Sequence, residues 1–186
     1  MALRHFLMCF TLYKSLVKTL NGFVLMDVID QSKVEACDCM LDTSIQQVEF
    51  DKQEVVEEYA YAKCYNLEEV KFHSDNVRFG KYVFHRCFKL KKVENFPAVK
   101  EVPDGMFSHC INLKDIQIKE GTQVIGDEAF GNCVSLKKVV LPSTCKLIKN
   151  YAFDYCIGLE ELHLPKDCKT RKKSFVNCRK LKLVWY

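Results

Sequence analysis

The sequence is short of the residues that build flexible linkers and membrane spans. Its 186 residues include only seven glycines and four prolines, so no long flexible linker is expected. No apolar run reaches the roughly 18 residues that a membrane-spanning helix needs. Basic residues exceed acidic ones only by 28 to 24, a net charge of +4, which is too small to predict nucleic-acid binding. The length suits one domain with a substantial core.

Cysteine, by contrast, is abundant. Eleven cysteines is an odd number, whereas a secreted disulfide scaffold is usually shorter and has an even count. Six of them recur at intervals of 23, 23, 23, 23 and 22 residues. These six are Cys64, Cys87, Cys110, Cys133, Cys156 and Cys178. A repeat of this length predicts an array of stacked structural units.

Apolar residues keep fixed distances from these cysteines. An aromatic residue stands three before each, namely Tyr61, Phe84, Phe107, Phe130, Phe153 and Phe175. A leucine stands three after each, and a valine, isoleucine or leucine six after. Most coils have another apolar residue eight after, but the second has Asn95 there, followed by Phe96. A further apolar column lies eight before, at Val56, Phe79, Val102, Ile125 and Ile148.

The pattern of one coil predicts its local structure. Leu-x-x-Val-x-Leu ends in a period-two alternation, which is typical of a short strand with one buried face. The stretch before it is too short for a helix of three turns, which leaves a single helical or 3₁₀ turn. One coil cannot bury its apolar edge alone, so the coils must stack. We predict a single-domain α/β solenoid with a parallel sheet on the concave face and short helical or 3₁₀ turns on the convex side.

The solenoid is expected to occupy residues 27–186, with six clear coils after a degenerate one. Ile45, Val48 and Phe50 have the strand pattern of that first coil, but Asp42 stands in its cysteine column. Residues 1–26 do not follow the repeat, and their apolar residues fall near helical spacing. We predict a capping helix there, because solenoids need capped ends. A signal-like segment is the alternative, since Phe6–Tyr13 is apolar, although no small-x-small cleavage site follows closely.

The fourth coil carries a resemblance to a known family. Residues 125–142 read Ile-Gly-Asp-Glu-Ala-Phe-Gly-Asn-Cys-Val-Ser-Leu-Lys-Lys-Val-Val-Leu-Pro. This run resembles the BspA-like (Treponema-type) leucine-rich repeat, as does the fifth coil at 148–165, and the likeness covers about residues 45–186. It implies a leucine-rich-repeat solenoid with no catalytic residues. Members of the family are commonly large surface or secreted proteins of bacteria and protists, implicated in adhesion and protein binding.

The cysteine column has two interpretations, a metal or redox array and a packed core column. We favour the core column, because free cysteine behaves as a small apolar residue and the period is regular. Cys145 and Cys168 share a second column and also look structural, while Cys37 and Cys39 alone are weak support for zinc. Parallel Cβ vectors suit disulfides poorly, so thiols are expected. Thiols favour a reducing compartment, which makes the cytoplasm our first expectation and a secreted or surface location the alternative.

The outward positions of the strands predict where a partner binds. Five residues after the cysteines the charges alternate, at Glu69, Lys92, Asp115, Lys138 and Glu161. Cross-strand charge pairing explains this better than a recognition surface. Towards the C-terminus the outward face becomes more apolar, with Val140, His163, Leu183 and Trp185. Exposed apolar and aromatic residues are typical of interface cores, so this end is the predicted partner site.

The C-terminal region is also strongly basic. Residues 166–182 hold eight lysines and arginines against Asp167 alone. Arg171, Lys172 and Lys173 are candidates for binding an acidic partner, phosphate or membrane headgroups, although a solvated coil whose charge discourages edge pairing is the simpler explanation. The sequence stops on its last strand, at residues 184–186. We therefore hypothesise that this edge pairs with a second copy or a partner, or that the sequence is a fragment of a longer array.

These features together predict a non-enzymatic protein-interaction module that binds an unidentified protein partner through its concave or C-terminal surface. No cofactor, metal site or catalytic residue is predicted, and no nucleic-acid ligand is expected. A secreted or surface adhesin is the first alternative. The remote alternative is a Cys–His enzyme, because His85 and His109 stand beside repeat cysteines, but no third orienting group is evident.

Overall fold

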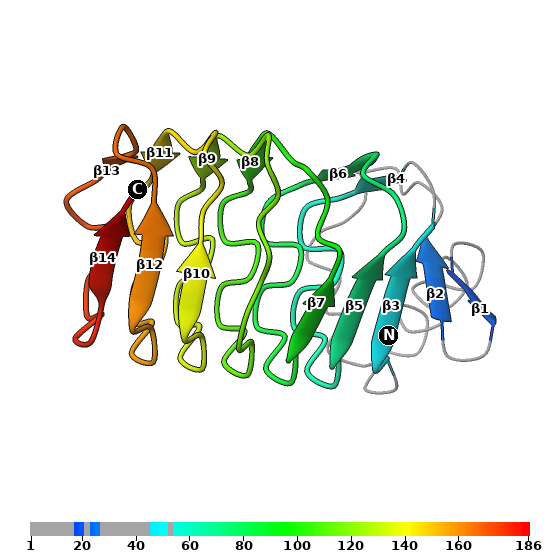
Figure 1. Cartoon of the computed structure of the whole chain (residues 1–186). Coiled ribbons are helices and arrows are strands. Elements are labelled where there is room, and N and C mark those ends of the chain that lie inside the picture. Colours follow the sequence, from blue (N-terminus) through cyan, green and yellow to red (C-terminus); the bar gives the residue numbers. More distant parts are fainter. Residues whose placement is uncertain (1–16, 21–22, 27–44, 52–53) are drawn as a thin grey trace.

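The structure is a computed structural model that describes residues 17–20, 23–26, 45–51 and 54–186. Its coils lie side by side along one axis (Figure 1). One side carries the front sheet, in two parallel parts. The first part orders β3 (Gln47–Phe50), β5 (Glu69–Phe72) and β7 (Lys92–Glu94), and the second orders β10 (Lys138–Val140), β12 (Glu161–Leu164) and β14 (Lys182–Trp185). The solenoid and its parallel sheet are as the sequence predicts.

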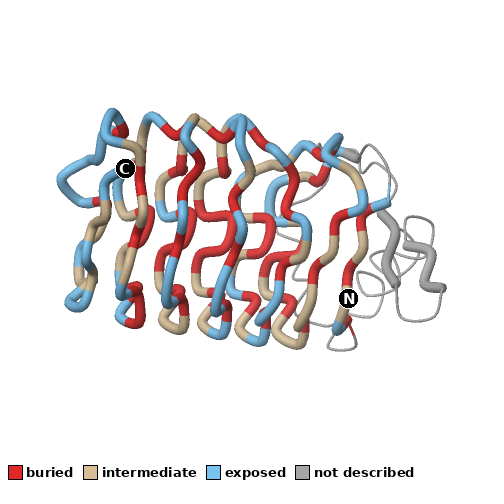
Figure 2. Tube along the Cα trace, in the orientation of Figure 1, coloured by how far each residue is buried: buried red, intermediate tan, exposed pale blue. Residues whose placement is uncertain are grey.

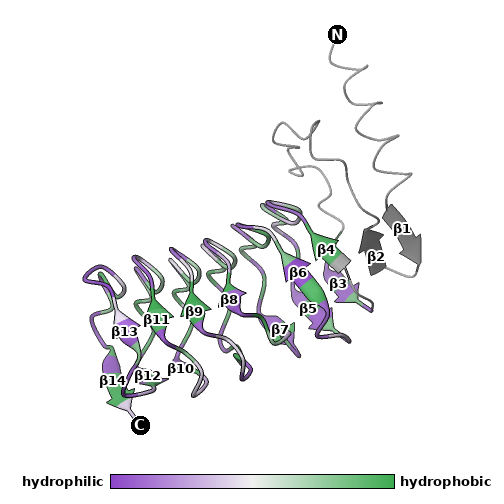
Figure 3. Cartoon of the chain, turned by 90° about the horizontal axis from the view of Figure 1, so that it is seen from above, coloured by the Kyte–Doolittle hydropathy of each residue, from purple (hydrophilic) through white to green (hydrophobic). Residues whose placement is uncertain are grey.

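A second set of short parallel strands forms the back sheet, which the sequence analysis did not predict. Its first part pairs β4 (Glu54–Val56) with β6 (Val77–Phe79). Its second part orders β8 (Glu101–Val102), β9 (Val124–Ile125), β11 (Leu147–Ile148) and β13 (Lys169–Thr170). The apolar column eight residues before the cysteines is the mark of these strands, because each of its members ends one of them. Figure 3 shows the coils and these strands from above.

The turns between the two sheets are not helical. Within the described residues, the segments that were expected to form helical or 3₁₀ turns are successions of tight turns. Alternate N–H groups donate along the axis to the next coil, as in Phe107 to Ala129 (2.8 Å) and Phe130 to Ala152 (2.8 Å). From Cys64 to Cys156, the residues one and five before each repeat cysteine adopt positive φ, for example Asn132 at 61° and Tyr151 at 58°. No helix forms here because these N–H groups bond to the neighbouring coil, which leaves only isolated i→i−3 bonds within each coil, such as Cys133 to Phe130 (3.2 Å).

These bonds make a third hydrogen-bonded array, which we call the turn ladder. Its donors come from residues five, three and one before each cysteine, and they join every coil to the next from Tyr59 to Val176. A non-glycine residue at positive φ is uncommon and mildly strained. The hydrogen bonds of the turn ladder offset this strain. Two of the three donors in each coil need a positive φ for their N–H groups to point along the axis.

The core is continuous through the stack (Figure 2). The strands of the front sheet alternate buried and partly exposed residues, as in β5 and β12. Aromatic rings three before the cysteines stack along the axis, with centroids 5.5 Å apart between Phe107 and Phe130 and 5.2 Å apart between Phe130 and Phe153. One buried cluster runs from Ile45 to Cys168. The described coils therefore share a single core.

Both sheets are interrupted in the middle of the solenoid. The third coil was expected to contribute a strand through Ile116 and Ile118, and both residues are buried, but no strand is formed there. Figure 1 accordingly shows no arrow between β7 and β10. In the coil before it, Asn95 adopts a φ of 54° and Phe96 is the residue that is buried. Asn95 is thus an inserted residue that turns the chain away after β7, in the manner of a β-bulge.

The N-terminal segment differs from its prediction where it is described. β1 (Val17–Leu20) pairs antiparallel with β2 (Phe23–Met26), whereas a helix was expected over 1–26. Residues 1–16 lie outside the described part of the chain, and so do Asp42, Cys37 and Cys39. The role of this segment as a cap stays a prediction. Among the described residues, no helix is long and apolar enough to cross a membrane.

Candidate partner-binding surfaces

Charge pairing on the front sheet is confirmed in both parts. Glu69 lies opposite Lys92, and their charged atoms are 3.0 Å apart. Lys138 lies opposite Glu161 at 3.3 Å, and Lys71 opposite Glu94 at 3.8 Å. Hydrogen bonding to His163 and Lys138 lowers the pKa of Glu161. Because neighbouring charges offset one another, this face has little net field to attract a highly charged ligand.

The predicted apolar end of the front sheet begins at Val140. This side chain is 50% exposed, an unusual exposure for valine in a strand. It lies opposite His163 in the β10–β12 register. The Nε2 atom of His163 is 2.9 Å from a carboxylate oxygen of Glu161. Val140 and His163 are therefore neighbours on one surface, as the sequence predicts.

The register of the last strand differs from the expected one. Leu183 lies opposite Leu162, and Trp185 lies opposite Leu164, whereas the sequence analysis placed them beside Glu161 and His163. Leu183 consequently packs against the core, and Val184 occupies the outward position beside His163. The last coil is shorter than the others, and its strand shifts by one residue, which exchanges its two faces. Trp185 is still 45% exposed, because no further coil covers β14 in this structure.

The basic candidates lie on a different surface. Arg171, Lys172 and Lys173 follow β13 of the back sheet, and all three are exposed. The Nζ atom of Lys173 lies 5.3 Å from the centre of the Tyr151 ring, in a cation–π contact. Arg171 and Lys172 line an open depression of about 500 Å³ with Lys149. The structure thus separates the predicted site residues into a front surface (Val140 and His163) and a basic back surface (171–173), while Leu183 and Trp185 lie on the core-facing side of β14.

The repeat cysteines are core residues with a specific hydrogen bond. The eight described cysteines are thiols, and seven of them are buried. Each thiol from Cys87 onward in the main column donates to the carbonyl of the aromatic residue in the preceding coil, for example Cys110 to Phe84 (3.2 Å) and Cys133 to Phe107 (3.2 Å). Burial raises the pKa of Cys133 to about 12. Such thiols are poor nucleophiles and poor metal ligands at neutral pH.

The second cysteine column brings two thiols together. The Sγ atoms of Cys145 and Cys168 are 3.8 Å apart, and both residues are buried. The hydrogen bond shared with Cys168, together with burial, raises the pKa of Cys145. This pair is packed in the wall of the solenoid, as the structural interpretation of the sequence predicts.

The histidines beside the cysteine column form no nucleophile pair. The rings of His85 and His109 lie 5.5 Å apart in an edge-on contact, and the Nδ1 atom of His85 is buried without a hydrogen-bond partner among the described residues. Burial, reinforced by the nearby charges of His109 and Arg86, lowers the pKa of His85 to about 4. An unprotonated His85 next to thiols of raised pKa lacks the ion pair that activates a cysteine.

Two surface groupings were missed by the sequence analysis. His73 has its Nε2 atom 3.1 Å from Glu49 and 3.7 Å from Asp51. These oxygen and nitrogen atoms could approach a cation, but two of the three residues are exposed and the contacts are those of an ordinary ion pair. On the turn side, Tyr155 and Val176 are exposed and joined by a backbone bond of 2.9 Å. Neither grouping has a signal in the repeat pattern, because both depend on residues outside the apolar columns.

Comparison with known proteins agrees with this geometry. A family model described as BspA type Leucine rich repeat region matches six copies, over residues 36–160 and 100–185. The chain belongs to the BspA-type leucine-rich repeat family. Such proteins are scaffolds built from repeats, which agrees with the stacked coils. No curated protein shows significant similarity to the chain.

Solved structures of bacterial leucine-rich repeat proteins are similar to this chain. The T. pallidum Leucine Rich Repeat protein is 28% identical with a TM-score of 0.64, over 75% of this chain and 69% of that one. A leucine-rich repeat protein from Eubacterium ventriosum is 24% identical with a TM-score of 0.61, over 73% of this chain and 41% of that one. A leucine rich cell surface protein from Faecalibacterium prausnitzii is 22% identical with a TM-score of 0.51, over 75% and 32%. The last two show the fold alone.

Proposed function

We propose that this BspA-type repeat protein is a non-enzymatic module that binds a protein partner through the C-terminal part of its front sheet. The observation that carries the proposal is the half-exposed Val140 beside His163, at the place where the charge pairs of the sheet give way to apolar residues. Val184 extends this surface beside His163, and Trp185, which lies opposite the buried Leu164, is exposed at the end of the stack. Apolar and aromatic side chains exposed together have little use on a surface that only contacts water.

The experiment is a comparison of two matched valines. Val140 and Val55 are exposed to the same degree, 50% and 51%, but Val55 lies in β4 of the back sheet. Proteins captured by the wild-type chain from its source cells are identified, and binding of one purified partner is then measured with Val140→Glu and Val55→Glu. We expect Val140→Glu to weaken binding at least about tenfold and Val55→Glu to leave it unchanged. Equal effects of both variants, or none, would contradict the proposal.

Self-association through β14 is a second interaction that we propose for the C-terminal end of the front sheet. β14 pairs only with β12 among the described strands, so its other edge carries unpaired backbone groups. Association of two such edges is opposed by Lys182 and the other cations of this coil. Light scattering at micromolar concentration, at low and high salt, tests it. A mass that doubles at high salt would support pairing, and a monomer under both conditions would exclude it.

The compartment is also a proposal. The free thiols favour a reducing compartment such as the cytoplasm, but the comparisons give no support to that preference. One similar structure is titled a cell surface protein, and this favours the alternative of a secreted or surface adhesin. Sequencing the N-terminus of the protein isolated from its source separates the two, because removal of about 20 residues indicates export.

A further inference from the structure

Two successive strands of the back sheet face each other without hydrogen bonds. In the other coils the residue after the back strand donates its N–H to the coil before. The bonds are Gly80 to Val56 (2.7 Å), Gly126 to Val102 (2.9 Å), Lys149 to Ile125 (3.0 Å) and Arg171 to Ile148 (3.1 Å). The residue at this position after β8 is Pro103, which has no N–H to donate. The carbonyl of Phe79 consequently accepts no hydrogen bond from the described residues.

The connection that leads to β8 is also shorter than its neighbours. From the buried Phe96 to Val102 the chain advances six residues, whereas it advances seven from Phe72 to Phe79 and from Ile118 to Ile125. The Nζ atom of Lys119 lies 2.7 Å from Asp75, although one whole coil separates these two residues in the stack. The Lys119 side chain therefore spans the intervening coil.

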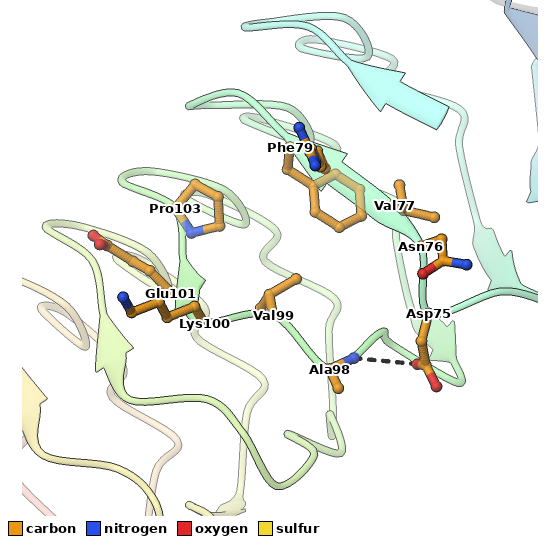
Figure 4. Close-up of a pocket in the computed structure, with 10 residues that line it drawn as sticks. Asp75, Asn76, Val77, Phe79, Ala98, Val99, Lys100, Glu101 and Pro103 are labelled. Atoms are coloured by element: carbon orange, nitrogen blue, oxygen red, sulfur yellow. Dashed lines mark hydrogen bonds between the residues drawn. The ribbon is translucent and has the colours of Figure 1, made fainter. Parts of the chain in front are cut away.

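The result is a groove of about 390 Å³ between β6 and β8. Figure 4 shows Val77 and Phe79 on one side of it, and Val99 and Pro103 on the other. The N–H of Ala98 donates to Asp75 (3.2 Å) and joins the two sides at one end. Beyond the other end, the N–H of Tyr82 donates to the carbonyl of Asp104 (2.9 Å). With both ends tied, the groove can accept side chains and single backbone groups but not an inserted strand.

The charges around the groove are unbalanced. The two acidic residues that line the groove already form ion pairs, Asp75 with Lys119 and Glu101 with Lys149, each at 2.7 Å. Arg78 and Lys100 line the groove and are exposed, and no ion pair joins either of them to a described residue. An apolar slot with two available cations attracts anionic groups attached to an apolar segment.

We propose that this groove binds an acidic peptide segment of a partner protein. An apolar side chain of the peptide lies against Phe79 and Pro103, its carboxylates face Arg78 and Lys100, and a backbone N–H is donated to the carbonyl of Phe79. The inference rests on the proposed function as a protein-binding module. It concerns the back sheet, however, while that proposal concerns the front sheet.

The probe is a fluorescent, end-capped hexapeptide of alternating glutamate and leucine, with a lysine–leucine peptide as its counterpart. Anisotropy is measured with the full chain at low salt. We expect binding of the glutamate peptide only, and a loss of at least about fivefold in Lys100→Glu. Lys146→Glu is the matched control, because Lys146 is the exposed residue at the same position two coils further on. It should bind as the wild type does.

A second variant separates geometry from charge. Pro103→Ala supplies the missing N–H without changing any charge, so it should close the groove, weaken peptide binding and show slow amide exchange at residue 103. No binding by the wild type up to about 1 mM, or equal losses in Lys100→Glu and Lys146→Glu, would overturn the proposal. Val140→Glu should bind the peptide normally. A failure of the front-surface proposal can thus be told apart from a failure of this one.

Discussion

At the scale of single residues, His85 links the stability of the solenoid to pH. Its folded pKa of about 4 lies below the ordinary value of 6.5 because the ring is partly buried next to His109 and Arg86. The unfolded chain therefore binds a proton first as the pH falls. The stabilising contribution is complete above about pH 6.5 and is lost progressively towards pH 4. In His85→Phe, urea midpoints measured from pH 7.5 to 4.5 should fall less than in the wild type; an unchanged slope would contradict this.

The thiol of Cys133 should matter to stability through packing and its hydrogen bond to Phe107. Cys133→Ala removes that bond and leaves a small void, so we expect a loss of about 1–2 kcal/mol in the free energy of unfolding. The same change at Cys178, which is only partly buried, should cost less. Equal losses at both positions, measured by urea denaturation, would argue against the packing explanation.

A substitution at Thr122, by contrast, should raise the free energy of unfolding. Its Oγ1 atom is buried and has no hydrogen-bond partner in the part of the chain that the structure describes, while the corresponding residue of the previous coil is Val99. Thr122→Val keeps the shape and removes the unpaired hydroxyl. Thermal and urea unfolding should show a gain of about 1 kcal/mol. A destabilised variant would mean that the hydroxyl is satisfied in solution, for example by a water molecule.

At the scale of elements, the front strands are held by packing more than by their charges. Lys138→Glu places two carboxylates opposite each other across β10 and β12. It should lower the unfolding midpoint, but by less than Cys133→Ala, because both side chains are largely exposed. The double variant Lys138→Glu with Glu161→Lys should recover most of the loss. If it recovers nothing, the residues act independently of their pairing.

The elements also differ in how far the sequence predicts them. The 23-residue period determined the coil, the cysteine column and the outward face of β10 and β12, because these depend on local alternation. The turn ladder could not be predicted in this way, since its donors bond to the next coil and its positive φ angles occur in tyrosine and asparagine as well as glycine. The register of β14 was missed because the counting assumed a constant spacing, and the strand shifted by one residue.

At the scale of the whole molecule, stability should be graded along the axis. Each coil rests on its neighbours, so a terminal coil has a partner on one side only. β13 is exposed, and β14 is only partly buried. Amide exchange should therefore be faster in residues 169–186 than in residues 124–164, with the difference persisting at neutral pH. Uniform protection over both regions would contradict this gradient.

The missing hydrogen bonds between β6 and β8, beside Pro103, give the molecule an uneven response to mechanical load. Three hydrogen-bonded arrays run along the axis, but only the turn ladder continues without interruption from Tyr59 to Val176. At the junction beside Pro103, tension between the two ends would be carried by the turn ladder and by contacts outside the sheets, such as the hydrogen bond from Ala98 to Asp75 and the stacked rings of Phe79 and Phe96, whose centroids are 5.9 Å apart. If the molecule were anchored at both ends and stretched, the coils around residues 96–118 would separate first. The middle of the solenoid is therefore its weakest region under tension.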